Sequence, residues 1–172
     1  MLNAITLTEL LDSRDARRDL QQRLLREHPE ETLVCLTVVM PGSEKRNATS
    51  LLVAHAAVEA LRETFADSLT QLTERDLKTG YEAYLLCRKP TIEAKRMTCE
   101  IEEQHPLGRL FDMDVLHADG RPVERWEVGK PPRTCLLCDN EARFCMRNHT
   151  HTQEELLQHI QDMTEAYVRE HV

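Results

Sequence analysis

The sequence lacks the features that would place the chain in a membrane, in a secretory pathway or on a nucleic acid. It has no apolar run as long as a membrane helix needs, and its first residues, MLNAITLTELLDSRDARR, have neither the basic start nor the apolar middle of a signal peptide. A basic excess is also missing, because 22 Lys and Arg stand against 30 Asp and Glu, which gives a formal net charge of -8. A phosphate backbone is therefore disfavoured as the main ligand. We expect a cytoplasmic protein without nucleic-acid or membrane partners.

Internal repeats and low-complexity tracts are absent as well. The length of 172 residues suffices for one domain with a sizeable core, or for one domain with an appendage. The chain does contain six cysteines. In the cytosol these are expected to be free thiols or metal ligands rather than a disulfide framework.

Three segments have the apolar spacing of helices. Residues 6–28 begin with a capping box and continue with leucines three and four positions apart, and Pro29 should end this helix. A second helix is expected at about residues 47–66, and a C-terminal helix follows a second capping box. The two capping boxes pair Thr6 with Glu9 and Thr152 with Glu155.

Other segments have the composition of strands. TLVCLTVVM, residues 32–40, is nearly all apolar and β-branched, as in a strand buried on both faces. Shorter candidates are EAYLLC, KRMTCEIEE and RLFDMDVLH, and the last leads through ADG to PVERWEV as a hairpin. This pattern predicts an α+β fold in which a mixed or antiparallel sheet packs against helices. Residues 1–130 would form the core, with the cysteine-rich segment and last helix, residues 131–172, in the same single domain.

GRLFDMDV, residues 108–115, places two aspartates in an apolar frame. Strand side chains alternate between faces, so Asp112 and Asp114 share one face and the apolar residues share the other. A buried carboxylate is costly unless a cation or good hydrogen-bond donors meet it. Two such carboxylates can converge on Mg²⁺, which commonly also binds substrate phosphates. The pattern predicts a magnesium site for phosphoryl or nucleotidyl transfer, with a solvated strand face as the simpler alternative.

Several residues could bind the phosphates of a substrate. Gly108 and Arg109 suggest a close backbone approach and a guanidinium that holds phosphate oxygens, although Arg109 could instead pair with an aspartate. Arg14 falls on the apolar stripe of the first helix, so its head either extends into solvent or lines a polar cavity. Lys45 and Arg46 follow MPGS at the start of the second helix, which indicates either a phosphate site or a plain surface turn.

The segment CLLCDNEARFCMRNHTH, residues 135–151, has metal-knuckle spacing. Two cysteines are separated by two residues, a third follows after six, and a histidine could complete four ligands. His151 fits better than His149 because it immediately precedes a helix cap. Structural Zn²⁺ would suit this set, and three reduced thiols packed as small apolar side chains are the alternative. The expected ligands are Cys135, Cys138, Cys145 and His151.

His105 stands before Pro106 at the start of the aspartate strand. A histidine with an ordinary pKa can accept a hydroxyl proton at neutral pH. His105 is therefore a candidate general base.

Four segments follow one another along the chain: SRDAR, VVMPGSEKR, HPLGRLFDMDV and PPRTCLLCDNEARFCMRNHTH. In order and approximate spacing they resemble the apo-citrate lyase phosphoribosyl-dephospho-CoA transferases, also called citrate lyase holo-acyl-carrier-protein synthases. The resemblance covers most of the chain, and the last two segments are its most specific parts. It implies a nucleotidyltransferase-type reaction that moves the prosthetic group from triphosphoribosyl-dephospho-CoA to a serine of the citrate lyase acyl carrier (gamma) subunit, with release of pyrophosphate.

The resemblance joins the candidate residues into one expected site. An attacking serine, a polyphosphate leaving group and Mg²⁺ held by the two aspartates would make an in-line displacement, which positioning and charge neutralisation catalyse. The expected catalytic residues are Asp112, Asp114, Arg109 and His105, and the expected substrate-binding residues are Arg14, Lys45, Arg46 and Gly108.

A protein of another class fits part of the same pattern. It would be a non-catalytic, zinc-stabilised adaptor or escort for a carrier protein or a lyase subunit, although a pure adaptor has no reason to bury an aspartate pair. Residues 121–151 hold six basic and four acidic residues, a local net charge of +2 in a chain of -8. Because carrier proteins of this kind tend to be acidic, this segment is expected to steer the carrier toward the aspartates.

Overall fold

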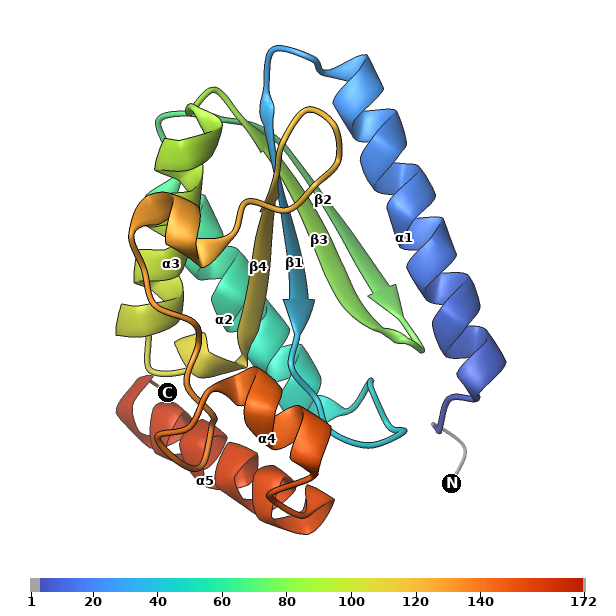
Figure 1. Cartoon of the computed structure of the whole chain (residues 1–172), viewed down its shortest axis with the longest axis vertical. Coiled ribbons are helices and arrows are strands. Elements are labelled where there is room, and N and C mark those ends of the chain that lie inside the picture. Colours follow the sequence, from blue (N-terminus) through green and yellow to red (C-terminus); the bar gives the residue numbers. More distant parts are fainter. Residues whose placement is uncertain (1–3, 172) are drawn as a thin grey trace.

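The computed structural model describes residues 4–171 and has an α+β fold with helices on both faces of one sheet (Figure 1). Within these residues no helix is both long enough and apolar enough to cross a membrane. In chain order the elements are α1 (Leu7–Glu27), β1 (Thr32–Val38), α2 (Ala48–Thr64), β2 (Leu69–Leu77), β3 (Gly80–Cys87), α3 (Thr91–Gln104), the 3-10 turn η1 (Gly108–Leu110), β4 (Phe111–Leu116), the 3-10 turn η2 (Arg125–Val128), α4 (Ala142–Asn148) and α5 (Gln153–His171).

The sheet has the strand order β2-β3-β1-β4, and all neighbouring strands are antiparallel. The predicted α+β class is confirmed, with the antiparallel alternative realised. As predicted, β1 is central, and its first five residues are buried because helices cover both faces of the sheet there. β4 lies at one edge of the sheet.

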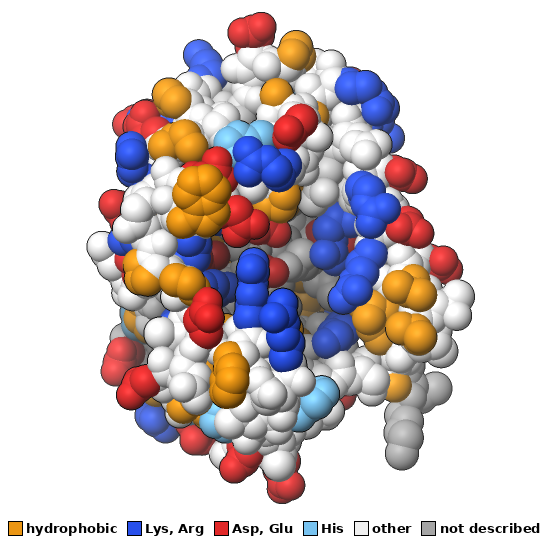
Figure 2. Space-filling model, viewed as in Figure 1, with side chains coloured by type: hydrophobic (Ala, Val, Ile, Leu, Met, Phe, Trp, Pro, Cys, Tyr) orange, Lys and Arg blue, Asp and Glu red, His pale blue; other side chains and the backbone are white. Residues whose placement is uncertain are grey.

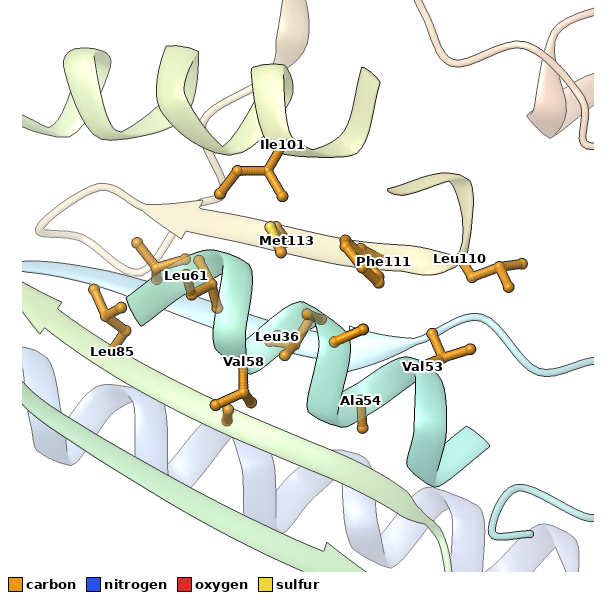
Figure 3. Packing of buried hydrophobic residues seen from close by; sticks show 14 of the residues in the cluster. Leu36, Val53, Ala54, Val58, Leu61, Leu85, Ile101, Leu110, Phe111 and Met113 are labelled. Carbon is orange, nitrogen blue, oxygen red and sulfur yellow. The ribbon is translucent and has the colours of Figure 1, made fainter. Parts of the chain in front are cut away.

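The larger core lies between the sheet and helices α2 and α3 (Figure 3). Alternate residues of β4 point into it, and Phe111, Met113 and Val115 are at most 1% exposed. Ile160 of α5 belongs to the same buried cluster, so the C-terminal helix packs onto the core formed by the preceding residues. The other members shown in the figure include Leu36, Val53, Ala54, Val58, Leu61 and Leu85.

A smaller core lies on the opposite face of the sheet, under α1. Leu24 of α1 packs there against Leu33 and Cys35 of β1 and against Tyr84 and Leu86 of β3. Burial of such side chains contributes about 25 cal/mol for each Å² of apolar surface removed from water. This core fixes α1 over β1 and β3.

Side chains cover the open edge of β4 where another strand could otherwise pair. The buried Glu102 accepts a hydrogen bond from Met113 N at 2.9 Å, and the buried Lys95 donates one to Met113 O at 3.4 Å. Arg133 donates another to Phe111 O at 2.9 Å. The backbone groups of the edge strand are thus satisfied by charged side chains, which also disfavours pairing with a second chain.

The three predicted helices are confirmed as α1, α2 and α5. Both predicted capping boxes form, since the Thr6 and Thr152 hydroxyls accept hydrogen bonds from the backbone of Glu9 and Glu155 at 3.1 Å. The carboxylates of the two glutamates accept the reciprocal backbone bonds.

The prediction of a strand at KRMTCEIEE was wrong, because these residues lie in α3. The alternation of small apolar and polar residues suggested a strand. The buried positions instead follow helical spacing, with Ala94, Thr98 and Ile101 on the face that packs on the sheet. Two charged residues on the same side, Lys95 and Glu102, are the ones that bind the edge of β4.

One further strand expectation needs correction, and one strand was missed. The hairpin partner expected at PVERWEV makes only an isolated bridge between Leu116 and Pro122 and then enters η2, since proline has no N–H with which to extend a ladder. The second edge strand, β2, was not predicted. Its sequence LTQLTERDL is mostly polar and contains no buried residue, so it carries little of the apolar alternation that marks a strand.

Candidate active site

Asp114 of β4 lines an open cleft between α1 and the edge of the sheet, and Asp112 lies two residues away on the same strand face. Cross-strand partners point to the same face, and Asp114 pairs with Cys35, whose side chain lies in the smaller core under α1. The cleft has a volume of about 330 Å³. Figure 2 shows a hollow on this side of the molecule, with Lys and Arg side chains along its margins. Its lining residues are Arg14, Arg17, Arg18, Gln21, Gln22, Leu25, Asp114, Asp119 and Gly120.

The expectation that the aspartate pair is buried was wrong. The Asp112 side chain is 49% exposed, and Asp114 is open to solvent on the wall of the cleft. The physical reason is the position of α1, which packs over β1 and β3 and leaves the same face of β4 uncovered. The two carboxylates are therefore accessible to a ligand.

The electrostatic surroundings of the two carboxylates differ. Asp112 accepts a hydrogen bond from the Thr37 hydroxyl at 3.3 Å and has Arg133 at 3.8 Å. Asp114 makes neither a side-chain hydrogen bond nor an ion pair with any residue from 4 to 171. Although solvent reaches it, the cleft walls partly desolvate its charge and raise the pKa of its carboxyl, and the negative charge of Asp112 raises that pKa further. A cation between the two carboxylates would relieve this repulsion.

Three arginines of α1 form the basic wall of the cleft. Arg14 lines the cavity. The sequence left open whether its head group extends into solvent or lines a polar cavity, and the structure has the second arrangement. Arg17 is anchored, since its Nε donates a hydrogen bond at 3.0 Å to Glu82, a residue only 2% exposed that also accepts from the Tyr84 hydroxyl. Of these three arginines only Arg14 was singled out from the sequence, although the spacing of Arg17 and Arg18 from it places all three on one helix face.

Lys45 and Arg46 do not line the cleft. Lys45 donates a hydrogen bond to Met40 O at 2.5 Å, and burial together with the charge of Arg14 lowers its pKa. Arg46 forms two hydrogen bonds of 2.7 Å with Asp76 of β2. The N-terminus of α2 is capped by its own residues, because Asn47 and Ser50 exchange hydrogen bonds. The turn therefore holds its basic residues in local contacts.

Gly108 and Arg109 connect β4 to its neighbours rather than to the cleft. Gly108 is buried, and its backbone approaches the carbonyl oxygens at the end of α3. The Arg109 guanidinium donates hydrogen bonds to the hydroxyl and the carbonyl oxygen of Thr134 in the cysteine segment. Neither residue lines the cavity.

Gly108→Ala should destabilise the protein markedly. A Cβ at this position would lie 2.5 Å from Glu102 O and 2.7 Å from Ile101 O, and both are backbone atoms that cannot move aside as a side chain can. Overpacking of this kind costs about 1–3 kcal/mol. Thermal unfolding followed by circular dichroism should show a lower melting temperature, and an unchanged one would contradict this account of the close packing.

His105 lies on the other face of the sheet from the aspartates. It packs on Phe111 of the larger core and on Tyr167 of α5, with ring centroids 4.8 and 5.6 Å apart. Its Nδ1 accepts a hydrogen bond from Leu107 N at 3.0 Å, and its pKa is lowered by burial and by the nearby His171. The structure does not bring His105 to the cleft.

The four expected metal ligands come together, with their ligand atoms all within 4.8 Å of one another. Cys138 Sγ lies 3.5 Å from Cys145 Sγ and 3.3 Å from His151 Nε2. Thiolates about 2.3 Å from a tetrahedral Zn²⁺ would lie roughly 3.8 Å apart, so the arrangement fits such an ion. The group could bind a metal such as zinc. Its members are Cys135, Cys138, Cys145 and His151.

Comparison with known proteins matches residues 5–167 to the family model described as apo-citrate lyase phosphoribosyl-dephospho-CoA transferase. Curated relatives of that name from Escherichia coli O139:H28 and Shigella boydii serotype 18 are each 38% identical over 162 residues, which cover 92% of this chain and 88% of the relative. "Protein CitXG" of Haemophilus influenzae is 36% identical over 166 residues, or 95% of this chain, and the chain spans only 36% of its length. The chain belongs to the apo-citrate lyase phosphoribosyl-dephospho-CoA transferase family.

Proposed function

We propose that the protein transfers the phosphoribosyl-dephospho-CoA group from its triphosphate precursor to a serine of the citrate lyase acyl carrier subunit and releases pyrophosphate. The names of the family and of its relatives support the transferred group and the citrate lyase. The observation that carries the chemistry is the cleft, in which basic residues of α1 lie across from Asp114, with Asp112 two residues away on the same face of β4. A triphosphate and a divalent cation need these two kinds of surface.

The reaction would be a displacement at the phosphorus next to the ribose. The serine oxygen forms a bond to that phosphorus, the bond to the outer two phosphates breaks, and these leave as pyrophosphate while the hydroxyl proton passes to a base or to solvent. Arg14, Arg17 and Arg18 would hold the phosphate oxygens, because guanidinium groups match them in geometry and charge. We assign His105 no part in this step because it lies across the sheet.

Asp112 and Asp114 would hold Mg²⁺, which when bound supplies positive charge to the phosphates. Their fit to a cation rests on the accessible position of both carboxylates and on the raised pKa of Asp114 beside Asp112. Arg133, 3.8 Å from Asp112, adds a fixed positive charge at the same place. Catalysis would then rest on positioning and on charge neutralisation.

The test is pyrophosphate release from the purified precursor in the presence of apo-carrier subunit, together with the mass gained by the carrier. A carrier with its target serine replaced by alanine serves as the control and should give neither signal. Without release from verified substrates, with and without Mg²⁺, the transferase proposal would fail. The adaptor alternative would then be favoured, and carrier binding without turnover would support it.

The carrier should dock on the surface around α4. Arg143 and Arg147 are exposed on this helix beside the exposed Phe144 and Met146. The helix starts next to Arg133, because Ala142 N donates a hydrogen bond to Arg133 O. This surface therefore lies close to the residues that contact Asp112.

Arg143→Glu combined with Arg147→Glu should raise the KM for the carrier about tenfold at low salt, with little change in kcat at saturation. Charges at the rim of an interface act mainly on association, and salt screens them. Steady-state kinetics at several ionic strengths measures the effect. The same reversal at Arg23 and Arg26, exposed on α1, is the matched control and should leave KM unchanged. An unchanged KM in the α4 variant at low salt would exclude this docking surface.

A further inference from the structure

Two arginines connect the cysteine segment to β4 in opposite directions. Arg109, in η1 just before β4, donates hydrogen bonds to the hydroxyl and carbonyl oxygens of Thr134. Arg133, the preceding residue of the cysteine segment, donates to Arg109 O at 3.2 Å and to Phe111 O at 2.9 Å. The same guanidinium lies 3.8 Å from Asp112. We call Arg109, Arg133 and Thr134 the arginine clamp.

The backbone of Arg133 is part of the knuckle that carries the metal ligands. Cys135 N donates to Asn140 O at 2.6 Å, and Ala142 N donates to Arg133 O at 2.8 Å. These two bonds, with the bridge between Thr134 and Glu141, close a tight loop around Cys138. Arg133 is thus two residues from one ligand and hydrogen-bonded to the first residue of the helix that carries another.

The four ligands join three separate pieces of chain. Cys135 and Cys138 lie in the knuckle, Cys145 in α4, and His151 just before α5. α4 itself contributes little packing to this register, because it is short and mostly exposed, with Cys145 its one buried residue. An ion bound by all four side chains would fix the knuckle relative to α5, whose Ile160 is buried in the core.

We propose that the Cys135–Cys138–Cys145–His151 group binds one Zn²⁺ and that this ion, through the knuckle, positions Arg133 against Asp112. The metal centre and the cleft are then coupled, although the ion never touches substrate. Arg133 is a positioning residue for the aspartate. The connection from the zinc site through Arg133 to Asp112 does not depend on the proposed function. Only the effect of this connection on turnover rests on the proposed function.

Metal content is the first measurement. The purified protein should contain about one zinc per chain by mass spectrometry, and cobalt substitution should give the absorption bands of a tetrahedral thiolate site. His151→Asn should lose the metal. His149→Asn is the matched control, because His149 is exposed, lies outside the group and has φ 47, a conformation that asparagine tolerates.

Hydrogen exchange then measures the coupling without any substrate. Removal of zinc with a chelator under reducing conditions should speed amide exchange about tenfold in residues 108–113, which the arginine clamp holds, and should leave β3 unchanged as the internal control. In Arg133→Met, the same amides should exchange fast with or without zinc, because the connection is already broken. Re-addition of zinc should restore slow exchange in the wild type only.

Turnover provides the functional readout. Zinc removal and Arg133→Met should each lower kcat about tenfold, and together should lower it no further, since both break the same connection. Absence of metal, or bound metal whose removal leaves exchange at residues 108–113 unchanged, would overturn the inference. The inference would also be overturned if zinc removal changed amide exchange at residues 108–113 in Arg133→Met as much as in the wild type. If zinc binding and the exchange response are found and no pyrophosphate is released, the proposed function fails and the coupling stands.

Discussion

Asp114→Asn should reduce prosthetic-group transfer by about 100-fold or more while the melting temperature of the protein rises. Loss of a group that stabilises charge at the reacting phosphorus commonly costs 10²–10³ in turnover, roughly 2.7–4 kcal/mol. The stability of the protein should increase in this variant. The cleft raises the pKa of the Asp114 carboxyl, so its ionised form opposes folding, and asparagine carries no such charge. Transfer assays and thermal unfolding at pH 7 measure the two effects on the same preparation.

The pH dependence gives the sign of the stability effect. The protonated carboxyl carries no penalty, and the penalty develops as pH rises from the ordinary value of 3.8 through the raised pKa of the folded state. The advantage of Asp114→Asn should therefore be larger at pH 7 than at low pH, and it should shrink as the pH falls toward 3.8. Asp67→Asn, an exposed position in the turn after α2, is the control for the change in net charge. Near-normal transfer in Asp114→Asn would exclude the aspartate from the reaction.

Arg14→Met should raise the KM for the triphosphate precursor about 10- to 100-fold. A hydrogen bond to a charged group contributes about 1.5–3 kcal/mol, and methionine keeps much of the arginine side chain's apolar contact while it removes the charge. Arg14 lines the cleft without an ion pair to any residue from 4 to 171, so its loss leaves no partner unpaired. Steady-state kinetics with the precursor as the varied substrate measures the effect.

Arg23→Met is the matched control for this variant. Arg23 lies on the same helix, is exposed and does not line the cleft, so the two variants remove the same charge from the same helix. The affinity of the wild type for inorganic triphosphate should also fall as salt rises, because salt screens the charges that bind it. The affinity of Arg14→Met should fall less over the same salt range. Equal KM values for the two variants would remove Arg14 from the phosphate site and would leave the anchored Arg17 as the residue to test.

Part of the site could be predicted because it depends on neighbours in the sequence. The alternation of β4 places Asp112 and Asp114 on one face in any strand, and the spacing of the cysteines brings three ligands into reach of one another. The choice of His151 over His149 also followed from a local feature, the helix cap that comes next. Such features follow from backbone geometry over a few residues.

Other parts could not be predicted from the sequence. Arg133 was noticed only as one charge among several, because its role depends on a contact with Asp112 across the fold. Glu82 lies in a strand of mostly apolar residues, and the sequence does not indicate its partner. In the folded protein, Arg17 of α1 donates a hydrogen bond to it. His105 precedes the aspartate strand, yet the chain turns through η1 and leaves it on the opposite face.

The sequence by itself determined the family, the α+β class, the three long helices, the central strand and the two groups of candidate site residues. Those features are set by motifs, by apolar periodicity and by caps, which act over short distances. Only the tertiary structure decided that α3 is a helix, that the aspartates are open to solvent and that Arg14 lines the same cleft as Asp114. These outcomes depend on where α1 and α3 pack on the sheet, because long-range packing decides which polar side chains remain uncovered at its edge.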